Sequence, residues 1–162
     1  MYTISAGIDS QQGQLLSQAP PIRTRQDDVR RKESVLQRLR VLGVSRYGLW
    51  HRETGYLSRI LHPDEYVGGV AYGHSSQNFV LLTATDRRII FVDIKPLFVE
   101  EDEISYDVVS GISYGHVGLA STVTLHTKVK DYKLRTYNPH CAAGFVRYIE
   151  ERCLERRKGE WR

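Results

Sequence analysis

The chain has 162 residues, of which 41% are hydrophobic and 26% are charged, and it carries a formal net charge of +4. This length suits one domain with a core and an appended segment, and it excludes two domains of ordinary size. The composition is that of a globular protein, and the small net charge excludes a histone-like polycation without indicating a particular partner.

The N-terminus has no basic segment followed by an apolar one, the pattern that a secretory signal requires. No stretch approaches the roughly 20 apolar residues that a membrane-spanning helix needs. We therefore expect a cytoplasmic protein, with a peripheral position at a membrane left open.

Two segments are predicted before the first strand. Residues 1–24 are rich in Ser, Gln and Gly, a composition that buries too little apolar surface to become ordered, and they predict a flexible tail. Residues 25–61 predict a helical extension with two helices. In the first, over residues 27–42, apolar residues recur at helical spacing between basic ones, and Gly43 provides a stop. The second, over residues 46–61, begins after Ser45 as its N-cap.

From residue 62 onward the pattern becomes that of β-strands, because Pro63 disfavours a helical conformation at His62 and short apolar runs follow. Residues 95–102 read as a loop, and the acidic run at residues 100–103 reads as solvated side chains. Seven short strands are predicted, over residues 66–72, 79–83, 89–92, 104–108, 111–116, 121–127 and 132–136.

The hairpin over residues 78–94 is the strongest β signal, since both of its arms are rich in β-branched and aromatic residues. The arms are nearly continuous in apolar residues, which predicts a position at the centre of a sheet with little water on either face. Between the arms, Asp86, Arg87 and Arg88 predict a solvated turn in which the Asp86 side chain caps backbone amides.

The last predicted element is an amphipathic helix, with Asn138 as N-cap and Pro139 as first helical residue. Its apolar residues repeat at helical spacing. Seven short antiparallel strands cannot close into a filled barrel without a plug, so this helix is expected to cap one end. The domain that it completes is predicted to cover residues 62–158.

Several short segments of the sequence, in a fixed order, resemble those of a known family. They are Ile60-Leu61-His62-Pro63-Asp64-Glu65, a strand, Leu82-Thr83-Ala84-Thr85-Asp86-Arg87-Arg88-Ile89-Ile90-Phe91, Ile104-Ser105-Tyr106 and the C-terminal helix. This arrangement resembles the bacterial pleckstrin-homology (PH)-like family of the YokE-like type. The resemblance implies a PH-like fold: a partly open seven-stranded antiparallel barrel capped by the C-terminal helix. It also implies a binding or assembly module, often oligomeric, with no reaction attached. The expected fold class is thus mainly β with flanking helices, two of them N-terminal.

The residues that could act in catalysis or bind a metal are scattered along the sequence. No two of the six histidines have the i, i+4 spacing that places two metal ligands on one helical face. The carboxylates at residues 100–103 lack the apolar isolation that raises a pKa for acid catalysis. No Gly-rich phosphate-binding loop opens a helix. We therefore expect no enzymatic activity, no cofactor and no metal.

The two cysteines are predicted to be free thiols. Cys141 and Cys153 are twelve residues apart on one predicted helix, a separation of about 18 Å that exceeds disulfide reach. Cys141 lies in the first turn, where a helix N-terminus lowers the pKa of a thiol. The sequence therefore predicts a reactive but non-catalytic thiol at Cys141.

Association with a protein partner or with further copies of the chain is the main functional prediction. The barrel and the basic N-terminal helices provide the surfaces, and the predicted contact residues are Trp50, Tyr47, Tyr56 and Phe98. In an equally good interpretation, these aromatic side chains cover the barrel within one chain.

Peripheral binding to anionic phospholipid membranes is the alternative function. The basic cluster Lys128, Lys130, Lys133 and Arg135 either meets anionic lipid or forms a solvated edge that discourages strand pairing. In phosphoinositide-binding proteins of similar fold the loop between the first two strands holds the headgroup with basic residues, whereas residues 73–77 contain neither Lys nor Arg. Nucleic-acid binding is disfavoured, because no aromatic residues are interleaved with the arginines of the first helix.

Overall fold

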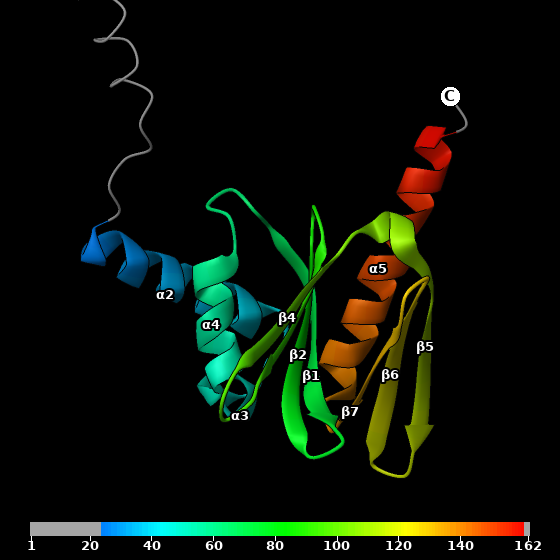
Figure 1. Ribbon diagram of the computed structural model, residues 1–162, viewed down its shortest axis with the longest axis horizontal. Helices are drawn as coiled ribbons and strands as arrows, with labels where there is room; N and C mark the ends of the chain where they lie inside the picture. The colour runs from blue at the N-terminus through cyan, green and yellow to red at the C-terminus, as the bar shows by residue number, and fades with distance from the viewer. Residues whose placement is uncertain (1–23, 161–162) are drawn as a thin grey trace, which may run out of the picture.

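The computed structural model describes residues 24–160 and shows seven antiparallel strands in one sheet, with helices against both faces (Figure 1). The spatial order of the strands is β4-β3-β2-β1-β7-β6-β5. The tail predicted over residues 1–24 lies outside the described residues except for Thr24, which caps the first described helix. The strands are β1 (Val67–Ser75), β2 (Asn78–Thr85), β3 (Ile89–Ile94), β4 (Val99–Ile104), β5 (Val109–Val117), β6 (Ala120–Thr127) and β7 (Asp131–Thr136).

The sheet has two halves that meet at one narrow junction. β1 pairs with β7 only through His74 and Arg135, whereas every other neighbouring pair of strands has at least four residue pairs. Within the described residues, β4 and β5 form the two free edges of the sheet. This is the partly open seven-stranded barrel that the family resemblance implied.

Helix α5 (Pro139–Glu160) lies between the two halves and fills the barrel (Figure 1). The Asn138 side-chain oxygen accepts a hydrogen bond from the Cys141 backbone N–H at 3.2 Å, which confirms the predicted N-cap. Ala142, Phe145 and Ile149 are buried against inward-facing side chains of both halves. The predicted capping role of the helix is therefore confirmed.

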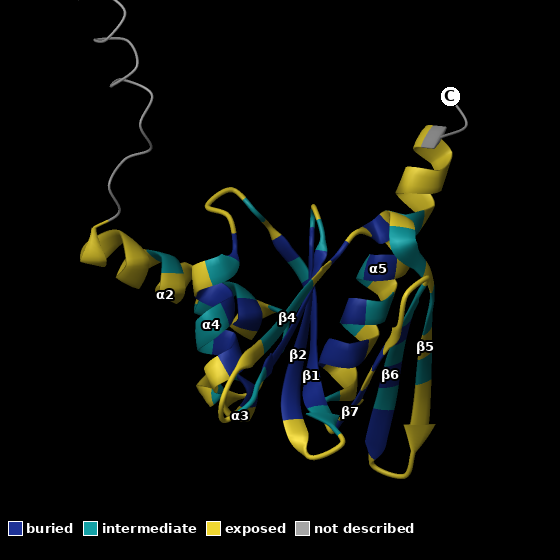
Figure 2. Ribbon diagram, in the orientation of Figure 1, coloured by how far each residue is buried: buried dark blue, intermediate teal, exposed yellow. Residues whose placement is uncertain are grey.

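The N-terminal helices pack on the outer face of their own sheet. α2 (Arg25–Val41), α3 (Arg46–Trp50) and α4 (Arg52–Ile60) share a second core cluster with outward-facing residues of β1, β2 and β3. Leu39 and Leu57 are fully buried in this cluster, and the Arg38 Nε donates to the Val67 carbonyl at 2.8 Å. Because helices cover both faces, β2 and β3 are buried along nearly their whole length, as their apolar sequence predicted (Figure 2).

The second N-terminal helix is broken, where the sequence predicted one continuous helix over residues 46–61. His51 adopts an extended conformation (φ −68°, ψ 148°) and separates α3 from α4. Its ring stacks on Phe79 of β2 with a centroid distance of 3.5 Å. The Thr54 hydroxyl donates to the Gly48 carbonyl at 2.6 Å and stabilises the change of direction. A tertiary ring contact thus overrides the local helical pattern.

The acidic segment forms edge strand β4 and is not the predicted loop. Six residue pairs join it to β3, and the strand predicted over residues 104–108 is largely a 3₁₀ turn, Tyr106–Val108. Lys95 pairs with Glu100, and Lys130 pairs with both Glu100 and Asp102. Hydrogen bonds from these lysines lower the pKa of Glu100 and of Asp102. Cations from neighbouring segments therefore offset the repulsion that argued for a loop.

The turn between β2 and β3 is an ion-pair junction and not the predicted solvated turn. The Glu65 side chain is fully buried and accepts two hydrogen bonds of 3.0 Å from Arg88, which also donates to the Ile60 carbonyl at 3.1 Å. Arg88 bonds Glu103 of β4 as well. Asp86 does cap a backbone amide, that of Tyr66, at 2.9 Å. The His-Pro-Asp-Glu and Thr-Asp-Arg-Arg segments are therefore bonded to each other.

Candidate interaction surface

Exposed large apolar side chains gather at one end of the molecule, which we call the apolar end. They come from α3, the β3–β4 loop, the β5–β6 turn and the β7–α5 connection, which lie along the lower edge in Figure 1. Trp50 is 87% exposed, Leu97 94% and Leu119 92%. The full set is Tyr47, Trp50, Leu97, Phe98, Val99, Val117, Leu119 and Tyr137.

Local geometry holds α3 in place at this end. The Tyr47 ring packs edge-on against His51 at 4.6 Å and against Phe79 at 6.0 Å. Ser45 caps the helix by accepting the Gly48 N–H, while its own backbone N–H donates to the Tyr72 hydroxyl at 3.1 Å. Trp50 follows on this anchored helix and remains exposed.

The Tyr72 hydroxyl also fixes the β7–α5 connection. It accepts a hydrogen bond of 2.8 Å from the Asn138 side-chain amide, which donates to the Gly43 carbonyl at 2.9 Å as well. Gly43 has a φ of +91°, a left-handed conformation that ends α2 as predicted. Next to these bonds lies a cavity of about 320 Å³, lined in part by Tyr47, Arg135 and Tyr137. The aromatic side chains of α3 and of the β7–α5 connection, Tyr47, Trp50 and Tyr137, are therefore presented on a hydrogen-bonded frame.

The charges around the apolar end are mainly those of arginines. Arg46 and Arg52 flank Trp50 in a cavity of about 540 Å³, and Arg135 is exposed on β7. Burial lowers the pKa of His51, although Glu53 beside it acts in the opposite direction. His51 is therefore neutral near pH 7, and the surface combines aromatic rings with guanidinium groups.

The structure brings three of the four predicted contact residues to this end. Tyr47, Trp50 and Phe98 are exposed there, and the Lys95 ammonium lies 4.9 Å from the centre of the Phe98 ring. Tyr56 lies on α4, is partly buried, and its hydroxyl donates to a Glu101 carboxylate oxygen at 2.7 Å. Tyr56 thus covers the sheet within its own chain.

The four basic residues predicted for an anionic surface do not form one cluster. Lys130 is ion-paired with Glu100 and Asp102 of β4. Lys128 is exposed in the β6–β7 turn, whereas Lys133 and Arg135 are exposed on the outer face of β7. Only Arg135 lies beside the apolar end.

Cys141 is buried, which corrects the prediction of a reactive thiol. Its sulfur lies 3.2 Å from the Leu42 carbonyl, to which the thiol donates. Burial raises the pKa of Cys141 to about 11, so desolvation outweighs the expected effect of the helix N-terminus. Cys153, also a free thiol, has a pKa raised by burial as well.

We expect Cys141 in the folded protein to react with iodoacetamide at pH 8 about a hundredfold more slowly than an ordinary thiol, because little thiolate is present. The rate should rise about tenfold per pH unit until the pH nears the pKa. Mass spectrometry of a Cys153→Ser variant, folded and in urea, measures this difference. Equal rates in the two states would contradict the inferred burial.

One histidine connects two other polar side chains across three strands. His126 lies 2.7 Å from the Ser113 hydroxyl through Nε2 and 3.0 Å from the Asp131 carboxylate through Nδ1. This is the hydrogen-bond order of a Ser-His-Asp triad, but Ser113 is exposed on the outer face of the sheet, where nothing excludes water. We interpret the three residues as a polar cross-strand ladder.

Within residues 24–160, no group of three or more His, Cys, Asp or Glu side chains is close enough to hold a metal ion. None of the helices in the same part of the chain is long and apolar enough to cross a membrane.

Sequence reasoning missed Leu97, Val99, Val117, Leu119 and Tyr137. Each lies in or next to a turn, and only the topology brings those turns to one end. The available signal was a large apolar residue at a position where turns are ordinarily polar.

A family model described as "Bacterial PH domain" matches residues 61–151, more than half of the chain. Among solved structures, the chain is similar to a DUF1696 family protein with a pleckstrin-homology domain from Shewanella loihica PV-4. The two share 13% sequence identity with a TM-score of 0.37, and the match covers 62% of this chain and 89% of that one. A comparison with curated proteins found no match.

Proposed function

The chain belongs to the bacterial PH domain family, and we propose that it is a non-catalytic module that associates with further copies of itself through the apolar end. The family match spans all seven strands and the first part of α5, so the fold is PH-like. Membership in this family indicates a binding module in general terms. The Thr-Asp-Arg-Arg hairpin supports the finer assignment to the YokE-like type.

The single observation that carries the proposal is the concentration of exposed apolar side chains at one end. Single apolar residues scattered over a surface need no explanation, but exposed apolar residues that several loops bring to one end indicate an interaction site. Trp50, Leu97 and Leu119 are among the most exposed apolar residues of the described chain. Leaving such side chains in water costs free energy that association recovers.

The residue types favour a protein partner over a lipid surface. Protein interfaces are enriched in aromatic residues and Arg, and are depleted in Lys. The apolar end has Tyr47, Trp50, Phe98 and Tyr137, with arginines around Trp50. The hydrogen-bonded frame beneath them lowers the entropy lost on association, which favours a stable complex.

We expect native mass spectrometry and light scattering to show an oligomer of the wild-type protein that dissociates on dilution. The Leu119→Ser and Trp50→Ala substitutions should each raise the dissociation constant about 30-fold, because each removes a large contact residue. Both side chains are exposed, so the folded protomer should keep its stability.

Val129→Ser is the matched control. Val129 is 86% exposed in the β6–β7 turn, at the other end of β6 from Leu119. Its substitution should leave the dissociation constant unchanged. A wild-type protein that stays monomeric at all concentrations, or a control as damaging as Leu119→Ser, would contradict the proposal.

Peripheral membrane binding is the second candidate function. The outer face of β7 carries the exposed Lys133 and Arg135 and leads to Tyr137 at the apolar end, a combination of charge and aromatic ring that suits an anionic bilayer surface. Vesicle flotation with and without phosphatidylglycerol separates the two functions. Flotation that depends on phosphatidylglycerol and is lost in a Lys133→Gln/Arg135→Gln variant would favour the membrane.

A further inference from the structure

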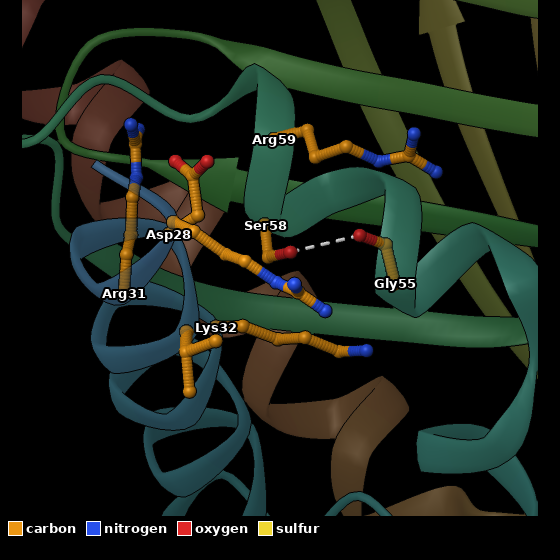
Figure 3. Close-up of a pocket in the computed structure, with 8 residues that line it drawn as sticks. Asp28, Arg31, Lys32, Gly55, Ser58 and Arg59 are labelled. Carbon is orange, nitrogen blue, oxygen red and sulfur yellow. Dashed lines mark hydrogen bonds between the residues drawn. The ribbon is translucent and has the colours of Figure 1, made fainter. Parts of the chain in front are cut away.

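A groove runs between α2 and α4, and its lining residues other than Ile94 and Val99 lie outside the segment that matches the family. Two cavities form it, with volumes of about 530 and 540 Å³, and they share Lys32, Gly55 and Arg59. The Lys32 side chain extends from α2 toward α4, where Gly55 and Ser58 lie, and Arg59 projects from α4 (Figure 3). The shared residues make the two cavities one elongated site.

The first half of the groove is cationic. Four cationic side chains line it, Arg25, Arg31, Lys32 and Arg59, against the single carboxylate of Asp28. Within residues 24–160, Arg25, Lys32 and Arg59 form no ion pair with a carboxylate. Arg25, Lys32 and Arg59 thus offer three positive charges to a multiply charged anion.

The second half adds aromatic side chains. Trp50, His51 and Tyr56 line it together with Arg52, and none of its lining residues is acidic. Trp50 is almost fully exposed in the single protomer, so a planar ring can stack on it without displacing another side chain of the same chain. In the proposed oligomer, this stacking competes with the contact that Trp50 makes. The Arg59 guanidinium lies 5.6 Å from the centre of the Tyr56 ring and joins the two halves.

We propose that this groove binds a nucleoside di- or triphosphate. The phosphates lie among Arg25, Lys32 and Arg59, whose donors suit phosphate oxygens, and the base stacks on Trp50. A phosphate monoester carries too few charges to neutralise the cationic half, and inorganic pyrophosphate leaves the aromatic half unused. The fold places Trp50 and Tyr56 in one groove with Arg25 and Lys32, which belong to a different helix.

Isothermal titration of the full chain with ATP, ADP, adenosine and inorganic pyrophosphate tests the proposal. ATP and ADP should bind saturably, pyrophosphate about tenfold more weakly, and adenosine without measurable affinity. A Lys32→Gln/Arg59→Gln variant should lose at least about tenfold in ATP affinity. Trp50→Ala should weaken ATP binding about tenfold and leave pyrophosphate binding unchanged.

A steric variant tests the site without changing its charge. A Cβ added at Gly55 would meet nothing within 4 Å, and Gly55 lines both cavities. Gly55→Leu should therefore fold normally, obstruct the groove and abolish saturable ATP binding. Thermal unfolding curves of each variant verify that the fold is intact.

The matched control is the Lys133→Gln/Arg135→Gln variant, which removes two exposed cations from β7 and should leave ATP affinity unchanged. Absence of saturable ATP binding by the wild-type chain overturns the proposal. So does an equal loss in the control variant, which would mean nonspecific attraction. Binding of a single-stranded oligonucleotide that ATP fails to displace also overturns it, in favour of nucleic acid. Leu119→Ser should retain ATP binding, so failure of self-association and failure of this site are distinguishable.

Discussion

Replacing Arg88 with Met is expected to lower the free energy of unfolding by about 3–5 kcal/mol, because it leaves the buried Glu65 carboxylate without its cation. Arg88 also donates to the Ile60 carbonyl and to Glu103, so the substitution removes one contact of the end of α4 and one of edge strand β4 as well. Urea unfolding followed by circular dichroism measures the loss as a lower midpoint.

Arg87→Met is the control for this prediction. Arg87 pairs with Asp64 at the surface, where solvent screens the charges, so its loss should leave the unfolding midpoint nearly unchanged. A double Glu65→Leu/Arg88→Met variant should recover part of the stability, because an apolar pair removes the unpaired buried charge. An unchanged midpoint in Arg88→Met would show that the ion pair is not a stabilising contact.

The junction between Glu65 and Arg88 also makes the stability of the fold depend on pH. Burial alone raises the pKa of Glu65, but hydrogen bonds from Arg88, the His62 backbone and Thr85 outweigh it, so the net pKa is lowered. A carboxylate with a lowered folded-state pKa stabilises the protein above its ordinary pKa near 4.5 and loses that effect as the pH falls through the lowered value. Acid unfolding below about pH 4.5 should therefore be less steep in a Glu65→Leu variant.

Gly73→Ala is expected to lower the free energy of unfolding by about 3 kcal/mol or more, because the junction between the two halves of the sheet has no room for a methyl group. A Cβ on Gly73 would lie 2.0 Å from the Arg135 carbonyl oxygen and 2.8 Å from its carbonyl carbon. These atoms are backbone, so relief requires β1 and β7 to separate at the one residue pair that joins them.

Thermal unfolding provides the measurement, with an expected fall in melting temperature of about 6–12 °C for a chain of this size. Gly115→Ala on β5 is the matched control, since a Cβ there would meet nothing within 4 Å. It should change the stability by less than about 0.5 kcal/mol. Equal melting temperatures for the two variants would mean that β1 and β7 are not held this closely.

Local signals predicted much of the fold. The paired apolar arms of the β2–β3 hairpin, the Asn138-Pro139 start of α5 and the Gly43 stop each depend on neighbouring residues, and the structure confirms all three. The barrel and its capping helix followed from the number of strands and from the family resemblance. The prediction of two N-terminal helices was correct except for the break at His51, which divides the second helix into α3 and α4.

The remaining features depend on contacts between distant segments. The break at His51 needs Phe79, and the burial of Arg88 needs Glu65, 23 residues earlier. The sequence predicts a loop over residues 95–102, because the lysines that offset the acidic residues of β4 include Lys130, 30 residues from Glu100. The apolar end and the interhelical groove arise only when separate turns and helices meet. None of these pairings has a signature in a local window of sequence.

The N-terminal helices cover the outer face of β1–β3. This contact predicts that relatives with and without these helices differ in the sequences of their second and third strands. Here Leu81, Ile90 and Val92 are apolar because helices outside the family segment cover them. A relative without such helices must place polar residues at these positions, so its second and third strands should alternate with a period of two. The pattern of two short strands in a relative's sequence therefore indicates whether it carries this extension.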